Sequence, residues 1–348
     1  MRLTRVAGLL ALVGLCGCAP LRYYAHVGHG QLSLLAQREP IARAIVDERI
    51  EVGVRERLRR VQAARRFASE RLDLPVNRSY TSYVQLDRPF VTWSVFATTE
   101  FSVEPVTHCF PIAGCVAYLG YFDRTLAERE AKRLAEQGDD TAVRGVAAFS
   151  TLGWFADPIV SSMLRGGDDE LDGVVFHELA HQKVYLRDDS AFNESYASFV
   201  AMQGLRDWHA ANHLPAPVST SRQDRAFTHL VLDLRERLRA LYATGQAEAV
   251  LRRRKHEEID AFRERYAHLR DQDWNGDDAY DAFVAAPINN ASLVPFGLYD
   301  RWTDAFAALF ARDGADWTVF HEDVRALARL PAPQRARRLA ELSGAKPD

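Results

Sequence analysis

The amino-acid sequence predicts an α+β protein that is mainly helical and contains one small mixed β-sheet. Apolar residues recur at helical spacing over residues 41–72 and 222–269, among many charged side chains. Between them, residues 80–122 are rich in Val, Tyr, Phe, Thr and Trp, broken by Pro, Asp and Gly, which is typical of short strands. We therefore expect a single domain over residues 41–348, with a charged helical hairpin, residues 219–270, inserted in it.

The N-terminus has the features of a secretory signal peptide, which we assign to residues 1–17. Arg2 and Arg5 give a positive start, an apolar stretch follows, and small residues lead to Cys18. This end also resembles the bacterial lipobox, whose cysteine is lipidated and becomes the mature N-terminus; the alternative is an ordinary cleaved signal. The lipobox resemblance implies a lipid on Cys18 and a tether over residues 18–40. Because alanine follows the cysteine, it also implies the outer membrane of a bacterial envelope, facing the periplasm.

Charge and cysteine content limit the classes of function. The chain has 44 basic and 47 acidic residues, a net charge of −3, so no basic field indicates nucleic-acid binding. Beyond Cys18, the remaining cysteines of the folded part are Cys109 and Cys115, which flank a short loop containing Pro and Gly. In an oxidising periplasm we expect a disulfide between them, with two free buried thiols as the alternative.

The stretch FHELAHQKVYLRDDSAFNESYASFV, residues 176–200, carries the candidate chemistry. On a helix, His177 and His181 lie one turn apart on one face and can share a metal ion. Zinc takes imidazole nitrogens and a third protein ligand, and Glu178 is placed to accept a proton from water that the metal has activated. Glu194, on the following helix, is the candidate third ligand. The alternative is an amphipathic helix that happens to contain two histidines.

The segments HELAHQ and FNESYASF resemble the gluzincin zinc peptidases, whose third ligand is a glutamate. Further segments, YYAHVGHGQLSLL, FPIAGCVAYLGYF, AAFSTLGWFADPIVSSML and INNASLVPFGLY, resemble a bacterial family of predicted aminopeptidases and extend over most of the chain. The resemblance implies a zincin-like fold with the sheet beside the motif helix. It also implies one Zn²⁺ ion held by His177, His181 and Glu194, with Glu178 as general base and a peptide as substrate. The short spacing from His181 to Glu194 implies a tight turn between their helices.

Other candidate residues have weaker support. Tyr299, close to the Asn289–Asn290 pair, could donate a hydrogen bond to a developing oxyanion, with packing in the core as the alternative. Asn193 either positions Glu194 or simply occupies the first turn of its helix. Trp154 and Phe155 line a substrate pocket or fill the core, and we expect the core.

The sequence therefore predicts a zinc metallopeptidase, an aminopeptidase by resemblance, attached to a membrane through its N-terminal lipid. Two alternatives stay open. One is an endopeptidase or amidase acting on periplasmic protein or cell-wall peptide. The other is a lipoprotein scaffold without catalytic activity. An aminopeptidase needs an acidic residue near the metal to bind the free α-amino group, and the sequence does not identify it.

Overall fold

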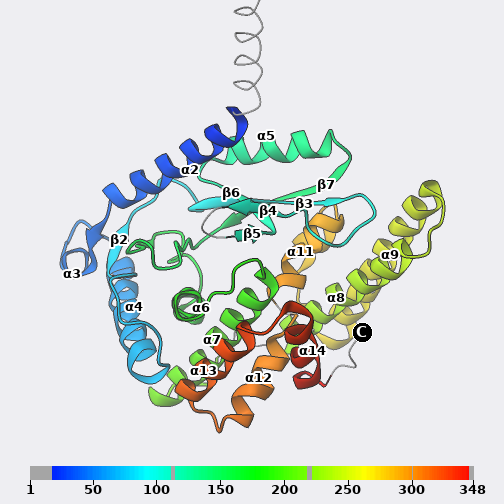
Figure 1. Cartoon of the computed structure of the whole chain (residues 1–348). Coiled ribbons are helices and arrows are strands. Elements are labelled where there is room, and N and C mark those ends of the chain that lie inside the picture. The colour runs from blue at the N-terminus through cyan, green and yellow to red at the C-terminus, as the bar shows by residue number, and fades with distance from the viewer. Residues whose placement is uncertain (1–17, 111–113, 218–221, 300, 345–348) are drawn as a thin grey trace, which may run out of the picture.

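The structure is a computed structural model that describes residues 18–110, 114–217, 222–299 and 301–344. Helices make up most of it, and its strands form two three-stranded sheets and a two-stranded hairpin, so the expected α+β class is confirmed (Figure 1). The prediction of one mixed sheet is wrong, because the strands divide into separate sheets and the one beside the motif helices is antiparallel. The strands are β1 (Glu39–Pro40), β2 (Ser82–Val84), β3 (Thr92–Thr99), β4 (His108–Phe110), β5 (Gly114–Val116), β6 (Tyr118–Tyr121), β7 (Asp139–Val146) and β8 (Ile159–Val160). The helices up to the motif region are α2 (Cys18–Ala36), α3 (Ile41–Ala44), α4 (Val52–Arg71), α5 (Arg124–Ala135), α6 (Asp168–Lys183) and α7 (Ser190–Ala211). Those that follow are α8 (Arg222–Tyr242), α9 (Glu248–His268), the π-helix η2 (Leu269–Asp273), α10 (Asp281–Ala285), α11 (Asn290–Tyr299), α12 (Thr303–Arg312), α13 (Trp317–Ala328) and α14 (Ala332–Leu342).

The main sheet has the strand order β6-β3-β7 and is antiparallel throughout. Because successive side chains of a strand point to opposite faces, Trp93 and Val95 pack against α5 on the outer face of the sheet. Thr92 and Ser94 point to the opposite, inner face. Figure 1 shows α2 and α5 on one side of this sheet and α6 and α7 on the other. The inner face is thus the face turned toward the motif helices.

Helices α6 and α7 form the centre of the largest hydrophobic core. Leu171, Val175 and Leu179 recur at helical spacing along α6 and are fully buried. Three acidic residues occupy the first turn of α6, where they stabilise the positive end of the helix dipole. Gly204 lets α7 approach α6 closely, because a Cβ at this position would lie 3.2 Å from the ring of Phe176. The motif helix is therefore held rigidly inside the protein.

Helices α8 and α9 form a hairpin with a hydrophobic cluster of its own. Phe227, Leu234 and Phe262 are buried in this cluster. Buried Lys255 of α9 pairs with Asp140 of β7, which fixes the hairpin to the main sheet. The predicted charged hairpin is present, and the structure does not test whether it is an insertion.

Several segments differ from the sequence-based expectation. Residues 18–40, expected as a tether, contain α2, which packs on the body through Val27 and Leu34. The segment around Asn290, whose Asn, Ser and Pro residues favour a loop, forms α11 with Pro295 inside it. Pro295 removes one helical hydrogen bond, but Leu293 and Leu298 are buried against neighbouring elements and keep the segment helical. Two further helices, α13 and α14, follow α12.

No helix in the described part of the chain is long and apolar enough to cross a membrane.

Candidate metal centre

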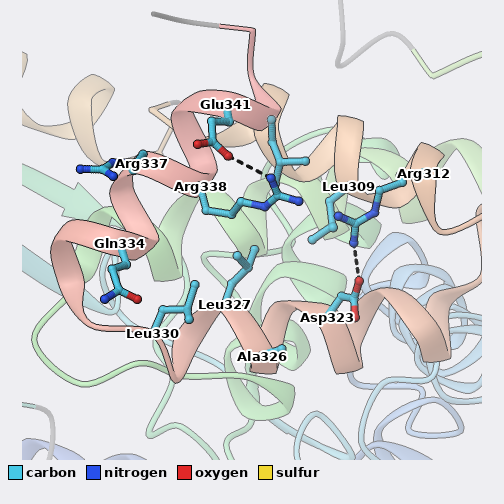
Figure 2. A pocket seen from close by; sticks show the side chains of 11 residues that line it. Leu309, Arg312, Asp323, Ala326, Leu327, Leu330, Gln334, Arg337, Arg338 and Glu341 are labelled. Atoms are coloured by element: carbon cyan, nitrogen blue, oxygen red, sulfur yellow. Dashed lines mark hydrogen bonds and ion pairs between the residues drawn. The ribbon is translucent and has the colours of Figure 1, made fainter. Parts of the chain in front are cut away.

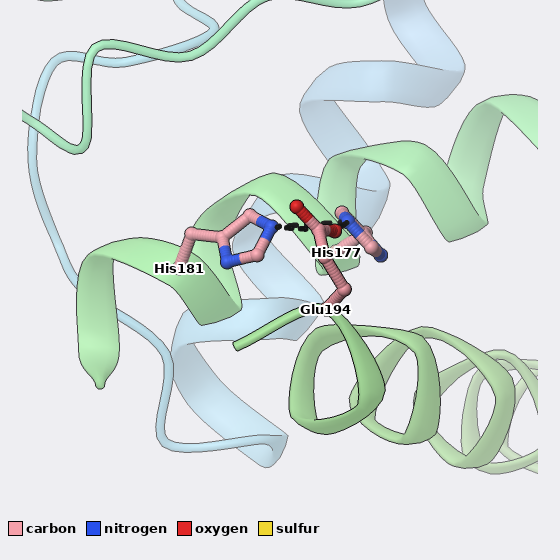
Figure 3. Close-up of side chains that lie close together, drawn as sticks. All are labelled: His177, His181 and Glu194. Atoms are coloured by element: carbon pink, nitrogen blue, oxygen red, sulfur yellow. Dashed lines mark hydrogen bonds and ion pairs between the residues drawn. The ribbon is translucent and has the colours of Figure 1, made fainter. Parts of the chain in front are cut away.

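His177, His181 and Glu194 lie together where α6 and α7 pack side by side. Figure 3 shows the three side chains pointing toward one another, two from α6 and one from the first turns of α7. The His177 Nε2 and His181 Nε2 atoms are 3.1 Å apart. Glu194 Oε2 lies 3.2 Å from His177 Nε2 and 3.4 Å from His181 Nε2. The spacing of the motif thus brings the three predicted ligands to one point.

These separations suit a tetrahedral cation. Zinc ligands lie about 2.0–2.1 Å from the metal, so two donors of one tetrahedron are roughly 3.3 Å apart. The three observed separations, 3.1, 3.2 and 3.4 Å, lie around this value. Two imidazole nitrogens and one carboxylate oxygen are also the donor types that catalytic zinc sites use, with a fourth position left for water or substrate. The residues present therefore fit the ion that the motif implies.

Within the part of the chain that the structure describes, the second ring nitrogen of His181 lacks the hydrogen bond that metal-binding histidines usually make. A ligating histidine commonly donates its second ring nitrogen to a carbonyl or carboxylate, which fixes the ring. His181 Nδ1 is buried and has no hydrogen-bond partner among the described residues. The ring of His181 is oriented instead by its packing, since its side chain is only 8% exposed.

Burial and charge act in opposite directions on the two most buried members of the site. Burial alone would raise the pKa of the Glu194 carboxyl, but His181 and His177 hold that pKa well below its usual range. Burial alone would lower the pKa of His181, but the Glu194 carboxylate outweighs it and the pKa is raised. Glu194 is therefore ionised and available to a cation.

The turn between α6 and α7 decides where Glu194 lies, and Asn193 fixes that turn. The Asn193 side chain accepts a hydrogen bond from the backbone N–H of Leu186 and donates one to its carbonyl, each at 2.7 Å. Asp189 caps α7 by accepting from the N–H of Phe192 at 3.0 Å, and it pairs with Arg335 of α14 at 2.8 Å. Asn193 thus positions the turn, which was one of its two predicted roles, and Asp189 is the cap.

The β4–β5 hairpin holds the same turn from the other side. In the structure a disulfide joins Cys109 and Cys115, which are paired across the hairpin. The N–H of Cys115 donates to the Asp188 carboxylate at 2.6 Å. Gly114 has a φ of +76°, and a Cβ there would lie 2.4 Å from Asp188 Oδ1, so this close approach requires glycine. The disulfide-closed hairpin is therefore docked on the turn that carries Glu194.

The three candidate ligand residues border a cavity of about 200 Å³ between α6, α7 and the inner face of the sheet. Glu178, next to His177 on α6, lines this cavity, as expected of a general base. The sheet side of the cavity carries small and hydroxyl-bearing side chains, Thr92, Ser94 and Gly120. The cavity thus combines these polar groups with apolar side chains such as Val146 and Phe149, and has room for substrate groups beside the three candidate ligands.

Tyr118 and Tyr185 also line the cavity, and the sequence analysis did not assign either of them a role in the reaction. Burial and the charges of Glu194 and Glu178 raise the pKa of the Tyr118 phenol far above its usual value, so the phenol keeps its proton. Successive side chains of a strand alternate between its two faces, and this alternation could have indicated the role of Tyr118. Tyr118 and Gly120 face the cavity, whereas Tyr121 faces α5. That assignment required the strand register, which the sequence alone does not provide.

Other predicted residues lie elsewhere or outside the described part. Tyr299 is the last residue of α11, and its side chain is outside the described residues, as is that of Cys18 at the start of α2. Asn290 has a structural role, since its amide donates to the carbonyl of Glu100 at 2.9 Å. Trp154 and Phe155, expected in the core, are 68% and 49% exposed.

A second hollow, of about 410 Å³, lies among α12, α13 and α14 and contains none of the candidate residues (Figure 2). Leu309 and Leu327 line it, and ion pairs between Arg312 and Asp323 and between Arg338 and Glu341 lie at its rim. The candidate metal ligands and Glu178 therefore lie at the cavity beside α6 and α7 and not at this hollow.

Comparison with known proteins gives one match. The protein family described as "Putative aminopeptidase" matches residues 22–339 of this chain. No curated protein and no solved structure matches it.

Proposed function

Because the chain belongs to this family of putative aminopeptidases, we propose that it is a zinc-dependent peptidase. In this proposal His177, His181 and Glu194 hold one Zn²⁺ ion and Glu178 is the general base. The observation that carries it is the set of donor separations, 3.1 to 3.4 Å, at the wall of a cavity that Glu178 also lines. The α+β fold, with the motif helix beside a small sheet, supports the further proposal of a zincin-like, gluzincin-type enzyme.

A zinc ion held there would polarise a substrate carbonyl and lower the pKa of water. Glu178 then accepts the proton of the attacking water and can pass it to the leaving amine, as a carboxylate base does in such sites. The protonated Tyr118 phenol donates a hydrogen bond to the oxygen on which negative charge develops. Asn193 and Asp189 take no part in proton transfer, because they act by holding the turn before Glu194.

The family description favours action on the amino terminus of a peptide. One observation favours the alternative, an endopeptidase or amidase. Glu178 and Glu194 are the only carboxylates among the described residues that line the cavity, and both already have a role. A substrate with a blocked amino terminus needs no further carboxylate to bind its ammonium group.

We also propose that residues 1–17 are a signal peptide and that Cys18 carries a lipid. This would anchor the enzyme to a bacterial envelope membrane, and the outer membrane facing the periplasm fits the alanine after Cys18 best. The support is the sequence pattern of this end, with its positive start, apolar stretch and small residues before Cys18. Radiolabelled palmitate incorporated by the wild type but not by Cys18→Ser tests this assignment.

The test of catalysis compares Glu178→Gln with wild type in a chain that lacks residues 1–18. We expect Glu178→Gln to bind one zinc ion as the wild type does and to lose about 10²–10⁴-fold in kcat. Zinc content by elemental analysis and turnover of peptide reporters with free and blocked amino termini supply the readouts. Unchanged turnover would exclude Glu178 as the base, and a zinc-containing wild type that cleaves neither reporter class would favour a scaffold without catalytic activity.

A further inference from the structure

We propose that the outward face of α2, formed by Leu21, Ala25, Gly28 and Leu32, is a membrane-contacting surface that lies on a lipid bilayer. At 100° per residue these four positions fall within about 60° of one another on the helix. All four are exposed, and Leu21 and Leu32 are 70% and 66% exposed. Tyr24, beside them, is 45% exposed. The outward face of α2 thus presents apolar side chains to the exterior.

The opposite face of α2 is firmly packed, so its position is well determined. Tyr23, Val27 and Leu34 contact the hydrophobic clusters of the body. Gly30 lies so close to Phe122 that a Cβ at position 30 would fall 2.3 Å from the ring. The exposure of Leu21 and Leu32 is therefore built into the fold and does not come from a loosely attached helix.

The neighbouring surface helix α5 shows how this protein normally covers an outward face. Arg124, Glu128, Lys132 and Glu136 are exposed along α5 and pair with one another. Residues 18–36 contain no acidic residue at all. A solvated helix face is normally polar, so the outward face of α2 is suited to an apolar or anionic partner.

A bilayer surface can contact both the apolar face of α2 and its positive charge. An interfacial helix buries its apolar face at the boundary between headgroups and acyl chains, and basic residues at its edge meet anionic headgroups. Exposed Arg22 lies at the edge of this face. Cys18, the proposed lipid site, is a residue of this same helix, so this inference rests on the proposed anchor, and a lipid there would bring α2 to the membrane first. Contact between this surface and the bilayer would give the lipid-anchored protein a defined orientation on the membrane, with or without peptidase activity.

Vesicle co-sedimentation tests the surface without a lipid anchor, using a chain that starts at Ala19. The buried clusters contain no residue before Tyr23, so this chain keeps every one of them. With vesicles of phosphatidylethanolamine and phosphatidylglycerol, Leu21→Ser/Leu32→Ser should raise the lipid concentration for half-binding at least about tenfold. The matched control is Val76→Ser/Val319→Ser, which changes valines that are 83% and 44% exposed elsewhere. Equal weakening of binding by both double variants would overturn the proposal.

A tethered chain tests the surface when affinity alone is too weak to sediment. A chain that starts at Cys18 is coupled through this thiol to a maleimide lipid in vesicles containing brominated lipids. Leu32→Trp should add emission that the bromines quench, whereas Val319→Trp should add unquenched emission, because Figure 1 shows α13 and α2 at opposite ends of the molecule. Unquenched emission from Leu32→Trp would overturn the proposal. If the emission of Leu32→Trp is unquenched and the protein is also a dimer that Leu21→Ser/Leu32→Ser dissociates, the proposal is overturned as well. In that case a second copy of the chain, and not a bilayer, covers the outward face of α2.

Discussion

The α6–α7 and α8–α9 pairs are both helical hairpins, but they are held together in different ways. In α6–α7 the short turn is fixed by contacts from three places: the side chain of Asn193 in α7, the side chain of Arg335 in α14 and the backbone N–H of Cys115 in the disulfide hairpin. In α8–α9 the connecting residues 243–247 are mostly exposed. In the proposed metal site the first hairpin must place a carboxylate to within a fraction of an ångström, whereas the second mainly packs its apolar side and is fixed to the sheet by the Lys255–Asp140 pair.

The two hairpins also use charge differently. Glu194 is nine-tenths covered by protein and faces two imidazoles, so its charge is a cost unless a cation or proton offsets it. The ion pairs of α8 and α9, such as Arg237 with Asp233 and Arg252 with Glu248, lie on the exposed side, where water already solvates them. Charge thus belongs to the candidate site in the first hairpin, whereas in the second it keeps the outer side solvated and, through Lys255 and Asp140, holds the hairpin to the main sheet.

The largest expected effect follows from removing the carboxylate of the first hairpin. Glu194→Ala should reduce bound zinc from one ion to a small fraction and abolish peptidase turnover, because two imidazoles alone leave the tetrahedral site incomplete. Elemental analysis after dialysis measures the metal. The matched control is Glu236→Ala in α8, since the Glu236 side chain is 65% exposed. This variant should keep the zinc content and the turnover of the wild type. Full zinc occupancy in Glu194→Ala would remove this residue from the ligand set.

The positions of the three candidate ligands could be predicted from the sequence, whereas those of Tyr118 and α11 could not, and the reason is physical. His177, His181 and Glu194 converge because helical periodicity and a short turn are local properties, which the sequence encodes directly. Tyr118 enters the cavity through its register against β3, a pairing between distant segments that no local pattern specifies. Likewise, α11 is helical despite Pro295 because burial of Leu293 and Leu298 outweighs local propensity.

The role of Tyr118 predicts the next largest effect. Tyr118→Phe should lower kcat about 10²-fold, with little change in KM and no change in zinc content, because the lost hydrogen bond forms mainly in the transition state. Tyr121→Phe, on the same strand but facing α5, is the control and should retain full turnover. Equal kinetic parameters for Tyr118→Phe and wild type would leave the oxyanion to another donor.

A smaller effect is expected from the turn itself. Asn193→Ala leaves the backbone N–H and C=O of Leu186 without their partner, which should cost about 2 kcal/mol of unfolding free energy. Zinc affinity should fall about tenfold, since groups that position ligands typically contribute this much. Denaturant unfolding of the metal-free chain and competition with a chelator measure the two quantities. Asn212→Ala, at the other end of α7, should change neither the unfolding free energy nor the zinc affinity by this much, because within the described residues its side chain donates to the carbonyl of Trp208, in its own helix.

The smallest effect belongs to the second hairpin, and it tests whether the comparison is sound. Arg237→Ala in α8 removes an ion pair whose side chains are 49% and 47% exposed. Solvent screening and the entropy of two long side chains offset most of the attraction in such a pair. We therefore expect the melting temperature, zinc content and turnover to remain those of the wild type. A clear loss of turnover with zinc retained would mean that α8 takes part in shaping the cavity, and the division between a hairpin that carries the site and one that only packs would no longer hold.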